Sequence, residues 1–118
     1  MKSEWINYKG KKIFYVNCSH LDPKSLAVEF EAVEKIITAE PLNSVLILTD
    51  VRGFITSPAA LDAFKQSTAR LKKYIRKETA IGITGVKNKF LESIQQFSGV
   101  KPVVFDDIDQ AKEWLVQS

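Results

Sequence analysis

The chain has 118 residues, of which 45% are hydrophobic and 26% are charged, and its formal net charge is +3. These values are typical of one soluble globular domain, residues 1–118, and no repeat or linker indicates a second one. No apolar run approaches the roughly 18–20 residues that a membrane span requires. The single cysteine, Cys18, excludes an internal disulfide framework and a cysteine-based metal site. Because the first residues also lack the apolar core of a signal peptide, we expect a cytoplasmic location.

The first third of the chain predicts a hairpin followed by a helix. Two β-rich runs, residues 5–8 and 12–18, surround a short turn that contains Gly10, which is typical of antiparallel strands. Asp22 and Pro23 then supply a helix cap and a proline at the first helical position. One apolar stripe at helical spacing follows: Leu26, Phe30, Val33 and Ile37.

The most informative segment is the apolar run from Val45 to Leu48, which ends in Asp50 and a turn that contains Gly53. A strand of this kind is buried on both faces, so we expect helices on both sides of its sheet. Ser57 and Pro58 then repeat the cap-and-proline start of a helix. The turn between strand and helix is where open α/β folds place their ligand or switch chemistry.

Strands and helices alternate strictly through the rest of the chain. We expect a second helix, a strand at residues 79–84, a third helix ended by Gly99, a strand at residues 102–105 and a final helix after Asp107. The expected inward faces of the three helices are Leu61, Phe64, Thr68, Leu71 and Ile75; Phe90, Leu91, Ile94 and Phe97; and Ile108, Ala111, Trp114 and Leu115. The order β-β-α-β-α-β-α-β-α predicts an α/β fold with a mixed, mainly parallel five-stranded sheet and an antiparallel edge strand.

Five cations gather within eight residues: Arg70, Lys72, Lys73, Arg76 and Lys77. They indicate either a patch for nucleic acid or an acidic membrane, or cations in the last turns of a helix, where the helix dipole favours them. No aromatic-rich binding motif accompanies them, so we favour the helix interpretation and expect no nucleic-acid partner.

Asp50 has three interpretations that the sequence leaves open. Its carboxylate could bind a divalent cation or ligand, pair with Arg52, or accept backbone N–H groups in the turn, and we favour the last. Ser57 is either a phosphorylation site at a helix N-terminus or simply a helix cap, and we favour the cap. Cys18 and His20 lie two residues apart, but no orienting third group completes a nucleophile. We therefore expect no enzyme, no cofactor and no metal.

The carboxyl ends of the parallel strands would bring several of these segments to one edge of the sheet. Residues 18–20, residues 50–53 and Thr84 would meet there, beside Thr56 and Ser57 at the start of the second helix. Exposed N–H groups, hydroxyls and the nearby Lys87 would suit a small anion, although every α/β sandwich has such an edge.

The element order resembles that of the STAS domain and the SpoIIAA-like family, which is related to bacterial anti-sigma factor antagonists. The resemblance spans nearly the whole chain and includes the hairpin, Asp50 and Gly53 after the apolar strand, and the closing Trp114-Leu115 pair. It implies a non-enzymatic regulatory module. Family members carry a phosphorylated serine in an Asp-Ser-Ser-Gly type motif at the second helix, and the matching segment, residues 55–58, implies Ser57 as the candidate.

We therefore expect a regulatory module that binds a protein partner through the loop of residues 50–57. The expected binding residues are Asp50, Arg52, Gly53, Phe54, Thr56, Ser57 and Thr84. A homodimer is a second form of partner, with Trp5, Ile6 and Tyr8 on the hairpin as its surface. The alternative is a binder of an anionic or lipid-like small molecule, with a pocket between the sheet and the second and third helices. An enclosed apolar cavity beneath Phe54, Phe64 and Phe90 would favour that alternative, whereas a filled core with an exposed apolar patch near the turn would favour a protein partner.

Overall fold

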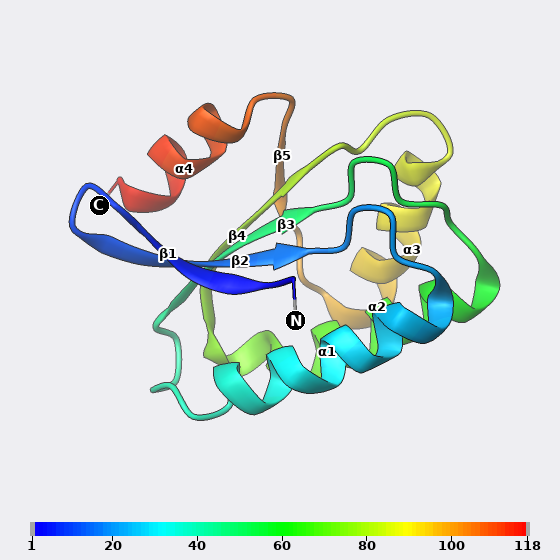
Figure 1. The fold of residues 1–118 in the computed structure, drawn as a ribbon, viewed down its shortest axis with the longest axis horizontal. Helices are drawn as coiled ribbons and strands as arrows, with labels where there is room; N and C mark the ends of the chain where they lie inside the picture. Colours follow the sequence, from blue (N-terminus) through cyan, green and yellow to red (C-terminus); the bar gives the residue numbers. More distant parts are fainter. Residues whose placement is uncertain (1, 118) are drawn as a thin grey trace.

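A five-stranded sheet in the order β1-β2-β3-β4-β5 forms the centre of the computed structural model, which describes residues 2–117 (Figure 1). β1 pairs antiparallel with β2 at one edge, and the other three pairings are parallel. The strands are β1 (Glu4–Tyr8), β2 (Lys11–Asn17), β3 (Val45–Asp50), β4 (Ile75–Ile81) and β5 (Val103–Phe105). The prediction of an α/β fold with a mixed, mainly parallel sheet is confirmed.

Four α-helices cover the two faces of this sheet. They are α1 (Pro23–Ile37), α2 (Pro58–Leu71), α3 (Lys87–Ser98) and α4 (Ile108–Val116), and a single 3₁₀ turn, η1 (Lys72–Tyr74), follows α2. The first three pack on one face and α4 packs on the other (Figure 1). Within residues 2–117, no helix combines the length and the hydropathy that a membrane crossing requires.

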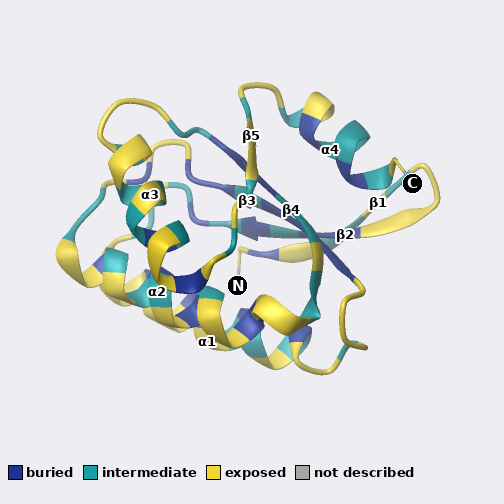
Figure 2. Cartoon of the chain, turned by 180° about the vertical axis from the view of Figure 1, so that it is seen from behind, coloured by how far each residue is buried: buried dark blue, intermediate teal, exposed yellow. Residues whose placement is uncertain are grey.

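β3 lies in the middle of the sheet and is buried on both faces, as its apolar run predicts. Val45 and Ile47 belong to the core beneath α1 to α3, whereas Leu46 and Leu48 belong to the core beneath α4. Figure 2 shows the buried residues on the sheet and on the helix sides that face it. Asp50 is the last residue of β3, so the buried strand holds it in place at the edge of the sheet.

The predicted helix boundaries are confirmed where a local capping signal marks them. The side chains of Asp22, Ser57 and Asp107 accept hydrogen bonds from the backbone N–H groups of Ser25, Ala60 and Asp109, at 2.7, 3.1 and 3.1 Å. Gly99 ends α3 with a φ of +76°, a left-handed conformation that glycine adopts without steric cost.

The second helix and the strand after it differ from the prediction. α2 ends at Leu71, so Ile75 begins β4 rather than closing the helix, and the strand runs over residues 75–81 instead of 79–84. The basic cluster therefore covers a helix end, a 3₁₀ turn and the start of a strand. The charged residues at the start of β4 hide the strand in the sequence, because a lysine there does not indicate burial. In the structure Lys77 lies beside the ring of Trp114 and donates to the carbonyl oxygens of Trp114 and Gln117 at the end of α4.

One smaller expectation about packing also needs correction. Phe97 is 52% exposed and lies outside the apolar face of α3, where the small side chain of Ser98 is buried instead. Trp5 is half-buried: its ring packs edge to face on Phe14, with centroids 5.0 Å apart, and Lys12 Nζ lies 4.3 Å from its centre.

The double burial of β3 leads to a stability prediction. Replacing Leu48, whose exposed fraction is 0%, by alanine removes buried methyl groups beneath α4 and should lower the free energy of unfolding by about 2–5 kcal/mol. Leu42→Ala is the matched control, because Leu42 is 63% exposed and its loss should cost less than about 0.5 kcal/mol. Urea unfolding measures both, and equal losses would contradict the burial of β3 beneath α4.

Candidate functional site

The loops that follow β2, β3 and β4 lie side by side at one edge of the sheet (Figure 1). Backbone hydrogen bonds continue the strand pairing into this edge: Cys18 N donates to Asp50 O at 2.9 Å, and Val51 N donates to Ile81 O at 3.0 Å. The expected convergence of these loops is therefore present.

Asp50 combines two of its three interpretations. Its carboxylate, 2% exposed, accepts the backbone N–H of Arg52 at 3.0 Å and the guanidinium of Arg52 at 3.0 and 2.8 Å. The hydroxyl of Tyr15 donates to the same carboxylate at 2.5 Å. A metal ion at Asp50 would need further protein ligands. The described residues contain no group of three or more His, Cys, Asp or Glu side chains that could hold one.

The charge of Asp50 is stabilised although it is buried. Burial pushes the pKa of this carboxyl upward, but the hydrogen bonds from Arg52 and Tyr15 outweigh that effect, and the pKa lies below its usual value. Burial and the neighbouring Asp50 raise the pKa of Tyr15 to about 12. Asp50 is therefore an ionised, fully engaged group, and its four contacts fix the start of the loop.

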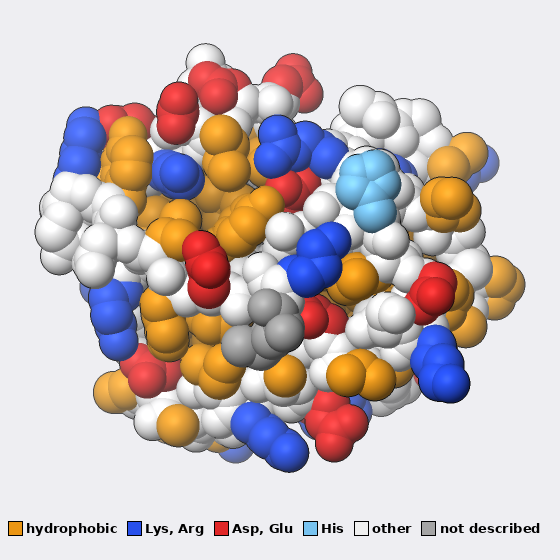
Figure 3. Space-filling model, in the orientation of Figure 1, with side chains coloured by type: hydrophobic (Ala, Val, Ile, Leu, Met, Phe, Trp, Pro, Cys, Tyr) orange, Lys and Arg blue, Asp and Glu red, His pale blue; other side chains and the backbone are white. Residues whose placement is uncertain are grey.

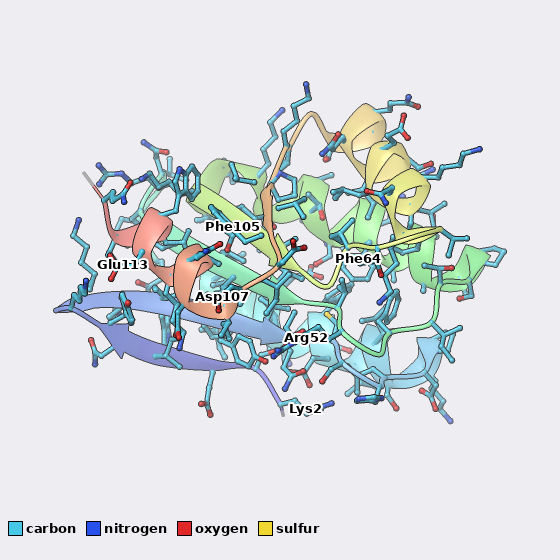
Figure 4. The ribbon with its side chains drawn as sticks, turned by 90° about the horizontal axis from the view of Figure 1, so that it is seen from above. Lys2, Arg52, Phe64, Phe105, Asp107 and Glu113 are labelled. Atoms are coloured by element: carbon cyan, nitrogen blue, oxygen red, sulfur yellow. The ribbon has the colours of Figure 1, made fainter. Side chains whose placement is uncertain are left out.

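The loop of residues 50–57 is anchored inward and exposed at its tip. The ring of Phe54 is 4% exposed and packs edge to face against Phe64 and Phe90, with centroids 5.5 and 5.7 Å apart. The next residue, Ile55, is 80% exposed, and Ser57 is engaged as the cap of α2. Figure 4 labels Arg52 and Phe64 in the view from above. The backbone is thus held on both sides of an exposed apolar side chain.

Gly53 allows the neighbouring loop to approach closely. Its φ is +70°, and a Cβ atom at this position would lie 2.3 Å from Cε1 of His20. His20 therefore packs on the backbone of the β3 loop, and Figure 3 shows the only histidine of the chain at the surface beside lysine and arginine side chains.

Lys87, the first residue of α3, ties the loop after β4 to the loop after β3. Its ammonium donates to the carbonyl oxygens of Val51 at 2.7 Å and Gly82 at 3.3 Å. Thr84 lies exposed in the same loop, and its carbonyl oxygen accepts the backbone N–H of Lys87 at 3.1 Å. The lysine thus has a structural role at the edge where the sequence suggests an anion site.

Cys18 and His20 do not form a nucleophile pair. The side chain of Cys18 is 0% exposed, and burial raises the pKa of its thiol, so the reactive thiolate is disfavoured. His20 is exposed and packs on Gly53, and no hydrogen bond joins it to Cys18 in the part of the chain that the structure describes.

The sequence analysis missed Glu78. This residue lies on β4 and, like Ala80, faces α2 and α3, where both line a cavity of about 50 Å³. Glu78 keeps partial exposure as a residue, but its Oε2 atom is buried and has no hydrogen-bond partner among residues 2–117. Burial raises the pKa of this carboxyl to about 7. A strand assigned from residue 75 would have revealed it, because side chains alternate between the faces of a sheet.

Comparisons of the chain with known protein families, with curated proteins and with solved structures found no match. The resemblance to the STAS domain and the SpoIIAA-like family therefore remains a prediction from the sequence.

The contact between Gly53 and His20 can be tested with a matched glycine. Gly85 also has a positive φ, +57°, but a Cβ atom there would meet nothing within 4 Å. Gly85→Ala should cost about 1 kcal/mol of unfolding free energy from backbone strain alone. Gly53→Ala should cost about 1 kcal/mol more, and His20→Ala in the same chain should remove that excess. An excess that persists without the imidazole would contradict the contact.

The carboxyl of Glu78 makes stability depend on pH. The pKa of Glu78 in the folded protein, about 7, lies above the ordinary value of 4.5. The protonated carboxyl therefore contributes stability to the fold that is fully present below about pH 4.5 and is lost as the pH rises through 7. Glu78→Gln should therefore stabilise the fold by about 1–3 kcal/mol at about pH 8 and change it little at about pH 4.5.

Urea unfolding at the two pH values measures this effect. Glu92→Gln is the matched control, because Glu92 lies exposed on α3 and should show no such difference. The same pH dependence in both variants would show that the burial of Glu78 is not its cause.

Proposed function

We propose that the protein is a non-enzymatic regulatory module of the STAS and SpoIIAA-like type that binds another protein. The partner would contact the loop of residues 50–57 and the N-terminal end of α2. The element order, with its opening hairpin and its closing helix over the second face, supports this assignment by resemblance. The resemblance implies a regulatory role, because the proteins of that family act by binding other proteins.

The observation that carries the proposal is the contrast between Phe54 and Ile55. Phe54 is 4% exposed and holds the loop to the core, whereas Ile55 is 80% exposed at its tip. Val86, in the loop after β4, is also exposed, at 74%. Rigidly supported apolar side chains at a surface favour a protein partner, because little conformational entropy is lost when they are covered.

The states of Asp50 and Cys18 favour no catalytic role for either side chain. The carboxylate of Asp50 is occupied by Arg52 and Tyr15, and the thiol of Cys18 is buried with a raised pKa. Neither group is available to accept a proton from a substrate or to attack one.

Ser57 is the proposed control point of this surface. Its hydroxyl accepts the backbone N–H of Ala60 at 3.1 Å, so it lies at the N-terminal end of α2. A phosphoryl group there would meet backbone N–H donors and the positive end of the helix dipole. It would also place about two negative charges two residues from Ile55, which would alter the partner surface.

Site-specific photo-crosslinking tests the proposal. A photoreactive phenylalanine at position 55 should capture a defined protein in the native cytoplasm, and the same residue at Val28, which is 63% exposed on α1, should not. Binding of the purified partner should weaken at least about tenfold in Ile55→Ser and less than about twofold in Val28→Ser. Ser57→Asp should change the affinity while thermal unfolding stays nearly unchanged.

Two results would contradict the proposal. One is capture of the same proteins from positions 55 and 28, and the other is an affinity that Ile55→Ser leaves intact. An adduct with twice the mass of the chain would identify the partner as a second copy.

A further inference from the structure

A cavity of about 50 Å³ lies between the sheet and helices α2 and α3 and is partly open to solvent. Three phenylalanine rings line it, Phe54, Phe64 and Phe90, and they pack edge to face with centroids 5.4–5.7 Å apart. Two aliphatic residues of α3, Leu91 and Ile94, also line the cavity. The lining is therefore mainly apolar and mainly formed by residues that the fold holds in place.

Four polar side chains belong to this wall, Thr49, Thr68, Lys87 and Glu78, and one of them has a buried oxygen without a partner. The carboxyl of Glu78 lines the cavity, and its buried Oε2 lacks a hydrogen-bond partner among the described residues. Buried carboxyl oxygens are normally paired, because an unpaired one loses its hydration without compensation. Lys87 lines the same cavity, but its ammonium is engaged by the carbonyl oxygens of Val51 and Gly82. Neither the threonines nor the lysine of this wall donates to Oε2, so the atom is free to accept a hydrogen bond from a molecule that enters the cavity.

The chemistry of the wall defines what that partner carries. A carboxyl group repels an anion and accepts hydrogen bonds from N–H or O–H donors. A cationic donor is favoured over a neutral one by the charge of the carboxylate. An ammonium group meets both conditions.

The volume limits how much of a ligand can enter. About 50 Å³ exceeds the roughly 10–15 Å³ that a water molecule needs, but it is well below the roughly 150 Å³ of a cavity that holds benzene. A head group of a few heavy atoms fits, and the remainder of a longer molecule has to leave through the opening. A narrow aliphatic chain suits the apolar lining better than a ring.

We propose that this cavity binds a primary ammonium group carried on a narrow aliphatic chain, with the carboxylate of Glu78 as its acceptor. This site is separate from the protein-binding role proposed above and does not depend on it. The pKa of Glu78, about 7, gives the binding a characteristic pH dependence. Because the ammonium selects the ionised carboxylate, affinity should rise about tenfold from about pH 6 to about pH 8.

NMR titration of methyl-labelled protein with n-butylammonium tests the proposal at both pH values. Saturable shifts should appear at Ala80 and Ile94, which line the cavity. n-Butanol and pentanoate, which have the same butyl chain without the cation, should bind at least about tenfold more weakly. Glu78→Gln should weaken butylammonium binding at least about tenfold, and Glu92→Gln on the exposed side of α3 should leave it unchanged.

Three outcomes would overturn the proposal: no saturable shift in the folded wild type at about pH 8, equal binding by n-butanol, or unchanged binding in Glu78→Gln. The glutamine variant should remain folded, because the substitution removes a buried ionisable group. Partner capture at Ile55 should be intact in this variant, so that failure of the cavity proposal and failure of the protein-binding proposal are distinguishable.

Discussion

The burial of β3 on both faces is the constraint on which the rest of the structure depends. Because Leu46 and Leu48 face one side of the sheet while Val45 and Ile47 face the other, helices must cover both sides. The parallel neighbours β2 and β4 then end at the same edge as β3 and place three loops together. The candidate site is a consequence of this packing rather than a separate feature.

Two carboxyl groups on neighbouring strands show how the two faces of one sheet set opposite chemical states. Asp50, toward α4, accepts hydrogen bonds from Arg52 and Tyr15, and its pKa lies below the usual value. Glu78, toward α2 and α3, lacks a partner for Oε2 within residues 2–117, and burial raises its pKa to about 7. Hydrogen bonding dominates in the first case and desolvation in the second. Asp50 is thus a structural anchor, whereas Glu78 is a carboxyl whose charge can change near neutral pH.

The sequence predicts the features that local physics determines and misses those that depend on tertiary contacts. The caps at Asp22 and Ser57 are readable because the capping side chain and its N–H partner lie three residues apart. The start of β4 is not readable, because Lys77 is drawn into the strand by carbonyl groups of α4 that are distant in sequence. Glu78 was missed for the same reason, since its importance arises only when α2 and α3 enclose it.

Phe54 belongs to both proposed binding regions. Its ring lines the cavity with Glu78, and its backbone continues directly into Ile55 at the exposed tip of the loop. A ligand that shifts the backbone at Phe54 would also shift Ile55, because the two residues are adjacent in the chain. If the cavity ligand changes the affinity for a protein bound at Ile55, linkage requires that this protein changes the affinity for the cavity ligand by the same factor. The Asp50–Arg52 contacts on one side and the Ser57 cap on the other confine such a movement to the short segment between them.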